Sequence, residues 1–74
     1  MIEKLKELSP VAVYLMREGP FGENTVLVVL EKEDPERFER IVSEIEEDYD
    51  FAMVSVEEFE KIKDVVEKSG ERLW

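Results

Sequence analysis

The stretch VAVYLMREGPFGENTVLVVLE, residues 11–31, decides the fold of this chain. Its two apolar runs, residues 11–16 and 25–30, are rich in β-branched side chains and apolar on both faces, which is typical of strands covered on two sides. Residues 17–24 join the runs through a segment that contains Gly19, Pro20 and Gly22. A connection of this length predicts an antiparallel hairpin.

Helices are predicted on both sides of this hairpin. Residues 2–8 carry apolar side chains about three positions apart, which predicts a short first helix ended by the Ser-Pro pair at 9–10. After the hairpin, Asp34, Pro35 and Glu36 provide an N-cap, a proline at the first helical position and an acid near the positive end of the dipole. The apolar residues that follow share helical spacing and form one stripe: Phe38, Ile41, Val42, Ile45 and Tyr49.

Residues 51–56 are predicted to form a third strand, and the order strand–helix–strand predicts a right-handed parallel crossover. Ser55 and Glu58 match a capping box that opens a last helix, and Gly70 is its natural stop. The buried face of that helix is predicted to contain Phe59, Ile62, Val65 and Val66. Residues 71–74 allow a short edge strand. Trp74 is either packed into the core or exposed for association.

The predicted fold class is therefore α/β (α+β). We expect a single compact domain over residues 1–74, with a mixed sheet of three to four strands covered by two to three helices. A chain of 74 residues buries only roughly 60% of its unfolded surface, so it has one small core and little room for a deep pocket.

Composition excludes several kinds of site. The sequence has no Cys and no His, which excludes thiolate and imidazole metal sites and Cys/His nucleophilic dyads. Any metal would have to be a hard cation bound by carboxylates. The chain also has no Gln and a single Asn, Asn24, beside many Glu, Lys, Val and Ile residues. That pattern is typical of a heat-adapted host.

The net charge of −10 disfavours nucleic acid and acidic membranes as partners, because the ten basic residues are scattered among twenty acids. A basic protein partner would be steered toward such a surface, although solubility is the simplest interpretation of the charge. No apolar run approaches the roughly 20 residues of a membrane span, and residues 2–9 are too charged for a signal peptide. We therefore expect a cytoplasmic protein.

Candidate site residues gather at the hairpin and at nearby strand ends. Arg17 beside Gly19 and Gly22 is a candidate nucleotide- or anion-binding turn, and a hairpin with a charged rim is the simpler interpretation. Glu23 and Asp50 are candidate metal ligands, although acids at strand ends are more often solvated. The acidic run over residues 44–50 resembles a weak cation site or a docking patch for a basic partner, although it lacks the spacing and the glycine of a calcium loop, and a solvated helix end is the simpler interpretation.

From residue 11 onward, the string VAVYL…TVLVVLEKEDPERFERIVSEIEEDYDFAMVSVEEFEKI…ERLW resembles a minimal nucleotidyltransferase domain of the DNA polymerase-beta superfamily. That family carries a Gly-Ser turn after the first strand, a pair of Asp residues at the second strand and a third Asp on a later strand. Here Arg17-Glu18 stands in the place of Gly-Ser. Alignment on LVVLE places Glu23 and Thr25 at the positions of the Asp pair, and a shift by one residue places Asn24 and Val26 there, so neither register restores the pair. Asp50 matches the third acid.

The resemblance implies a degenerate, non-catalytic member, because nucleotidyl transfer depends on metal ions that the acidic motif positions. The first hypothesis is thus a protein that acts through protein–protein contacts, antitoxin-like or homodimeric, and without a cofactor. One alternative is a weak transferase that binds Mg²⁺ through Glu23 and Asp50, if that site survives. Another is a nucleotide-binding regulator that uses Arg17.

Overall fold

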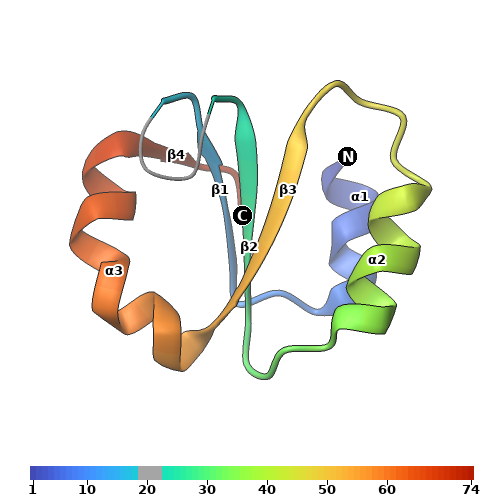
Figure 1. Cartoon of the computed structure of the whole chain (residues 1–74), viewed down its shortest axis with the longest axis horizontal. Helices are drawn as coiled ribbons and strands as arrows, with labels where there is room; N and C mark the ends of the chain where they lie inside the picture. Colours follow the sequence, from blue (N-terminus) through green and yellow to red (C-terminus); the bar gives the residue numbers. More distant parts are fainter. Residues whose placement is uncertain (19–22) are drawn as a thin grey trace.

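The structure, a computed structural model, describes residues 1–18 and 23–74. Its strands are β1 (Ala12–Met16), β2 (Thr25–Leu30), β3 (Asp50–Ser55) and β4 (Gly70–Arg72). Its helices are α1 (Ile2–Leu5), continued by a 3₁₀ turn η1 (Lys6–Leu8), then α2 (Pro35–Ser43) and α3 (Val56–Ser69). The sheet forms a middle layer, with α1 and α2 on one face and α3 on the other (Figure 1).

The strand order across the sheet is β3-β2-β1-β4. Strand β1 is antiparallel to both of its neighbours, with Met16 opposite Thr25 on one side and Gly70 on the other. Strands β2 and β3 are parallel, with Thr25 opposite Asp50. The predicted α+β class is confirmed: a compact domain with a mixed four-stranded sheet and three α-helices in the described residues. The central hairpin pairing and the edge strand in the tail are also confirmed.

Every residue of β1 and β2 is buried, as the apolar pattern on both faces predicts. The side chains that face α1 and α2 are Val13, Leu15, Val26, Val28 and Leu30. Those that face α3 are Ala12, Tyr14, Met16, Leu27 and Val29. Across the second of these layers, the Tyr14 ring stacks on Phe59 with 5.6 Å between centroids. The sheet is therefore held by two apolar layers, one on each side.

Helix α2 begins as predicted but ends earlier. The Asp34 Oδ1 atom accepts a hydrogen bond from the Arg37 backbone N–H at 3.4 Å, and Pro35 is the first helical residue. The apolar stripe from Phe38 to Tyr49 predicts a helix as far as Tyr49. This prediction is wrong, since α2 ends at Ser43. Four acids follow that end, and negative charge opposes the helix dipole there: Glu44, Glu46, Glu47 and Asp48. Ile45 and Tyr49 still pack on the core from the connecting segment.

Helix α3 begins at its predicted cap, where Ser55 Oγ accepts a hydrogen bond from the Glu58 backbone N–H at 3.2 Å. Phe59 and Val66 are buried, as expected. The placement of Val65 on the buried face is wrong, since 47% of this residue is exposed. Neighbouring positions on a helix lie about 100° apart, and the single face that α3 packs on the sheet includes Val66 but not Val65.

Gly70 ends α3 as predicted, but for a different reason. A glycine stop normally adopts the left-handed conformation, whereas Gly70 has φ −106° and ψ 162°, which any residue can adopt. The constraint is space: a Cβ atom at this position would lie 2.5 Å from Met16 Sδ and 2.8 Å from the Val66 carbonyl oxygen. Gly70 therefore allows β4 to approach β1 closely.

Trp74 combines features of both predicted alternatives. Its backbone N–H donates to the Val13 carbonyl and its carbonyl accepts from the Val13 N–H, each at 3.2 Å. Its indole Nε1–H donates to the Pro10 carbonyl at 3.3 Å, and Lys6 Nζ lies 4.6 Å from the ring centroid. The residue is nevertheless 45% exposed. Trp74 is thus fixed against β1 and still presents apolar surface.

Candidate functional site

The fold brings three predicted site residues, Arg17, Glu23 and Asp50, to the end of the sheet where β1 ends and β2 and β3 begin. The Asn24 N–H donates to the Arg17 carbonyl at 3.3 Å, and the Asp50 N–H donates to the Asn24 carbonyl at 3.2 Å. The end of β1 and the starts of β2 and β3 are linked in this way, and Glu23 precedes Asn24. Gly19 and Gly22, the remaining residues of the predicted anion-binding turn, lie outside the described residues.

The described residues at this end of the sheet have few of the features of a ligand-binding site. Arg17 is exposed, and its Nη2 lies 3.4 Å from Glu71 Oε2, so a carboxylate already accompanies the guanidinium. Glu23 and Asp50 are also exposed. Within residues 1–18 and 23–74, no group of three or more acids is placed so that it could hold a metal ion. The parallel strands β2 and β3 begin at this end of the sheet, whereas ligand sites of α/β sheets lie at the opposite end, where parallel strands finish.

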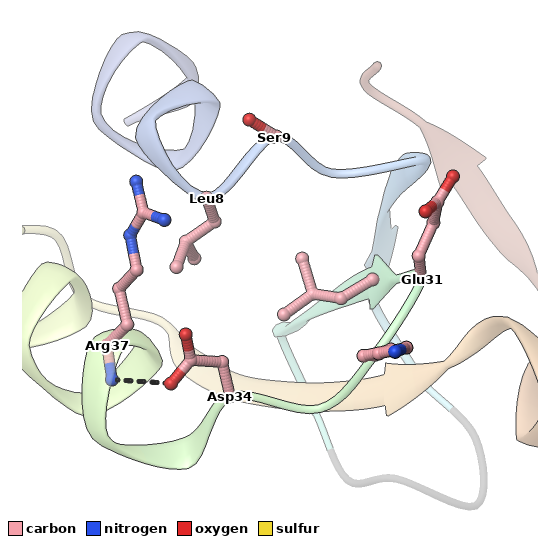
Figure 2. A pocket seen from close by; sticks show the side chains of 7 residues that line it. Leu8, Ser9, Glu31, Asp34 and Arg37 are labelled. Carbon is pink, nitrogen blue, oxygen red and sulfur yellow. Dashed lines mark hydrogen bonds between the residues drawn. The ribbon is translucent and has the colours of Figure 1, made fainter.

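The carboxyl end of β2 has a cavity of about 330 Å³ (Figure 2). It is lined by Leu8, Ser9, Leu30, Glu31, Lys32, Asp34 and Arg37. Arg37 Nη2 donates to the Glu7 carbonyl, and the Asp34 carboxylate caps α2, so both charged groups already serve the fold. With two acids and two bases around an apolar floor, the cavity has no net charge. Its volume is at the lower limit for small-molecule pockets.

A pair of carboxyl groups lies near the same end of the parallel strands. A hydrogen bond with the Glu58 carboxyl raises the pKa of Glu33 above its usual value, and repulsion by the Glu58 charge acts in the same direction. Ser55 Oγ also lies 3.5 Å from Glu58 Oε1. Both glutamates are exposed. The pair therefore binds a proton more readily than separate side chains would.

The two outer edges of the sheet differ. Strand β4 has only three residues, two of which are the charged Glu71 and Arg72, and short charged edges resist pairing with other chains. Strand β3 has six residues, DFAMVS, with no Lys, Arg or Pro, and it lies at the outer position of the sheet next to β2. The residues from Phe51 to Ser55 are only half-buried. Strand β3 is thus the edge that lacks the usual protection.

The backbone of β3 indicates which groups face outward. Alternate residues of a strand bond to a given neighbour. The Asp50 N–H donates to the carbonyl of Asn24, the residue before β2. Every second residue after Asp50, namely Ala52 and Val54, therefore also directs its N–H and C=O groups toward β2. The N–H and C=O groups of Phe51 and Met53 then point away from the sheet. This outer row has the geometry on which an added strand forms hydrogen bonds.

Charge is distributed asymmetrically around this edge. Residues 41–60, which contain β3 and both of its flanks, include no Lys or Arg. They include eight of the twenty acids: Glu44, Glu46, Glu47, Asp48, Asp50, Glu57, Glu58 and Glu60. Lys4 Nζ lies 3.4 Å from Glu44, and the Met1 amino group lies 3.7 Å from Glu47. These two cations leave most of the eight acids without an ion pair among the described residues, so the apolar β3 strand lies between two acidic segments.

Sequence reasoning found the acidic run but not the exposed strand edge. The available signal was the absence of Lys and Pro from residues 50–55. That absence has no meaning until the sheet order places these residues outside.

Comparison of the chain with family models, with curated proteins and with solved structures gave no match. In the part of the chain that the structure describes, no helix is both long and apolar enough to cross a membrane.

Proposed function

We propose that this protein is a non-catalytic domain that acts through protein–protein contacts, on a scaffold like that of a degenerate nucleotidyltransferase. The observation that carries the proposal is the unprotected edge of β3, which is six residues long and half-buried from Phe51 to Ser55. Natural sheets cover or charge such edges unless another chain occupies them. We place the protein in the cytoplasm, with a protein partner or a second copy of itself and with no nucleic-acid partner, since its net charge is −10.

A variant that protects β3 tests this proposal. Met53→Lys keeps an unbranched stem over the half-buried α1/α2 side of β3 and adds a charge to this edge strand, where lysine discourages strand pairing. Val65→Lys is the matched control, because it makes the same change of charge at an exposed apolar position on α3. Tagged wild-type protein and both variants are incubated with an extract of the source cells, and the mass of each purified protein is measured by sedimentation.

We expect the wild type and Val65→Lys to retain a partner, or to form a dimer, and Met53→Lys to lose that association. If all three proteins are monomers and retain nothing, the proposed function is wrong. If all three retain the same protein equally, action through protein contacts stands, but through a surface other than β3.

The alternative is a nucleotide-binding or weak Mg²⁺-dependent transferase function at the hairpin edge. The observation that favours it is the backbone link from Arg17 through Asn24 to Asp50, which brings two of the predicted site residues to the same end of the sheet. An NMR amide titration with Mg²⁺ and then ATP tests this alternative. Localised shifts at Arg17, Glu23 and Asp50 would support it, and the absence of such shifts at millimolar ligand would exclude it.

A further inference from the structure

We propose that the outer edge of β3 binds an extended, basic segment of a partner protein as an added strand. This inference rests on the proposed function and specifies its surface and its partner. The middle of the added segment is apolar, and Lys or Arg residues lie at its ends. It would extend the sheet order β3-β2-β1-β4 by one strand beside β3.

The geometry of β3 fits strand addition. The outward N–H and C=O groups of Phe51 and Met53 supply the backbone hydrogen bonds. The side chains on either side of this backbone belong to the two core layers: Phe51 and Met53 pack on the α1/α2 side, and Ala52 and Val54 on the α3 side. All four are half-buried. An added strand would cover the exposed part of both layers, and burial of apolar surface favours its binding.

Charge identifies the class of partner. One end of β3 follows Glu46, Glu47 and Asp48 and begins with Asp50, and the other end leads into Glu57 and Glu58. Residues 41–60 contain no Lys or Arg. Among the described residues, Glu47 has a cation within 4 Å, the Met1 amino group at 3.7 Å, and Glu58 already contacts Glu33. Lys or Arg residues at both ends of an added strand would therefore lie against opposite charge. Charge pairing of this kind increases the association rate and selects the partner.

The same charges disfavour a second copy of this chain. A closed pair of two β3 strands about a twofold axis is antiparallel, so Asp50 of one copy would lie near Ser55 of the other. The acidic flanks would then meet at both ends of the pair. Like charges facing each other across an interface are unfavourable, so the observations favour a basic partner over a homodimer.

The test uses ¹⁵N-labelled protein and two matched peptides, Lys-Lys-Ile-Thr-Val-Thr-Ile-Lys-Lys and the same sequence with Glu in place of Lys. We expect the basic peptide to shift the amide signals of Phe51, Met53 and Ser55 most and to slow their hydrogen exchange. The acidic peptide should bind at least about tenfold more weakly, a difference of about 1.4 kcal/mol. Added salt should weaken the binding of the basic peptide. Met53→Lys should weaken it as well, and Val65→Lys should not.

A tethered form makes a negative result decisive. A Gly/Ser linker of about 16 residues has a root-mean-square length of about 20–24 Å, and such linkers give millimolar effective concentrations. The molecule measures 29 × 25 × 17 Å, so a basic peptide fused after Trp74 through this linker can reach β3. If neither the added nor the tethered peptide shifts the β3 amides, the inference is wrong.

Two other outcomes also overturn the inference. Equal binding of the acidic and basic peptides would remove the role of charge. Shifts at the β3 amides that grow with protein concentration and without peptide would identify a second copy as the occupant. Either result leaves the proposed function in place, because that function is refuted only by the extract and mass measurements on the wild type and the two lysine variants.

Discussion

Replacement of Gly70 by alanine tests how closely β4, the short charged edge strand, packs against β1. Gly70 joins α3 to β4, and its φ of −106° imposes no strain on alanine. If conformation alone mattered, Gly70→Ala would stabilise the protein by about 0.4–1 kcal/mol, because it restricts the unfolded chain. The packing predicts the opposite sign, since the new Cβ would lie 2.5 Å from Met16 Sδ and 2.8 Å from the Val66 carbonyl oxygen.

The magnitude follows from how little these neighbours can move. Met16 is fully buried between the sheet and α3, and the Val66 carbonyl belongs to the helix backbone. Forcing an extra carbon into a packed site costs typically about 1–3 kcal/mol, which exceeds the entropic gain. We therefore expect a net loss of about 1–2 kcal/mol. In a domain of this size such a loss lowers the Tm by roughly 5–15 °C.

Thermal and urea unfolding measure this effect through far-UV circular dichroism and the fluorescence of Trp74. The matched control is Ser69→Ala, an exposed change at the preceding position, which should alter the Tm by a few degrees at most. A Gly70→Ala protein that is as stable as the wild type, or more stable, would show that the neighbours yield. The explanation of the glycine by close approach of β4 to β1 would then be wrong.

Three further predictions concern α3 and its surroundings. Phe59→Ala should lower the free energy of unfolding by about 3–5 kcal/mol in urea titrations, because it leaves a cavity beneath Tyr14. Ser55→Ala should cost about 1 kcal/mol by removing the N-cap, and Ser55→Thr should keep most of it. The pKa of Glu33 is raised in the folded protein. Its hydrogen bond with Glu58 therefore stabilises the fold fully below pH 4.5, the usual pKa of Glu, and this stabilisation is lost as the pH rises through the raised pKa. Glu33→Gln should therefore raise the Tm at neutral pH by more than it does near pH 4, whereas Glu39→Gln should show no such trend.

The strands and helix starts were predictable because local chemistry specifies them. Residues 25–30 are apolar at every position after Thr25, and such a strand has to be covered on two faces. Asp34 and Ser55 cap the helices that they were expected to cap, since the geometry of a cap is set within three residues.

Features that depend on tertiary context were not predictable in the same way. The stripe that runs to Tyr49 has helical spacing, but Ile45 and Tyr49 reach the core without a helix. Val65 is apolar and has suitable spacing, yet the single sheet-facing side of α3 leaves it exposed. The role of Gly70 comes from a contact with β1 that is distant in sequence. The sheet order, and with it the exposed edge of β3, is of the same kind.

The charges around β3 give a physical reason why an apolar edge strand without Lys, Arg or Pro would not pair with copies of itself. An apolar edge segment without Lys or Pro pairs readily with copies of itself, unless charged residues flank it. Here the acids before Asp50 and after Ser55 supply those flanks, and all of them have the same sign. Repulsion between identical flanks disfavours self-pairing at either end, whereas a segment with basic ends meets attraction at both. The acidic flanks that oppose self-association therefore also select the class of partner for the same strand.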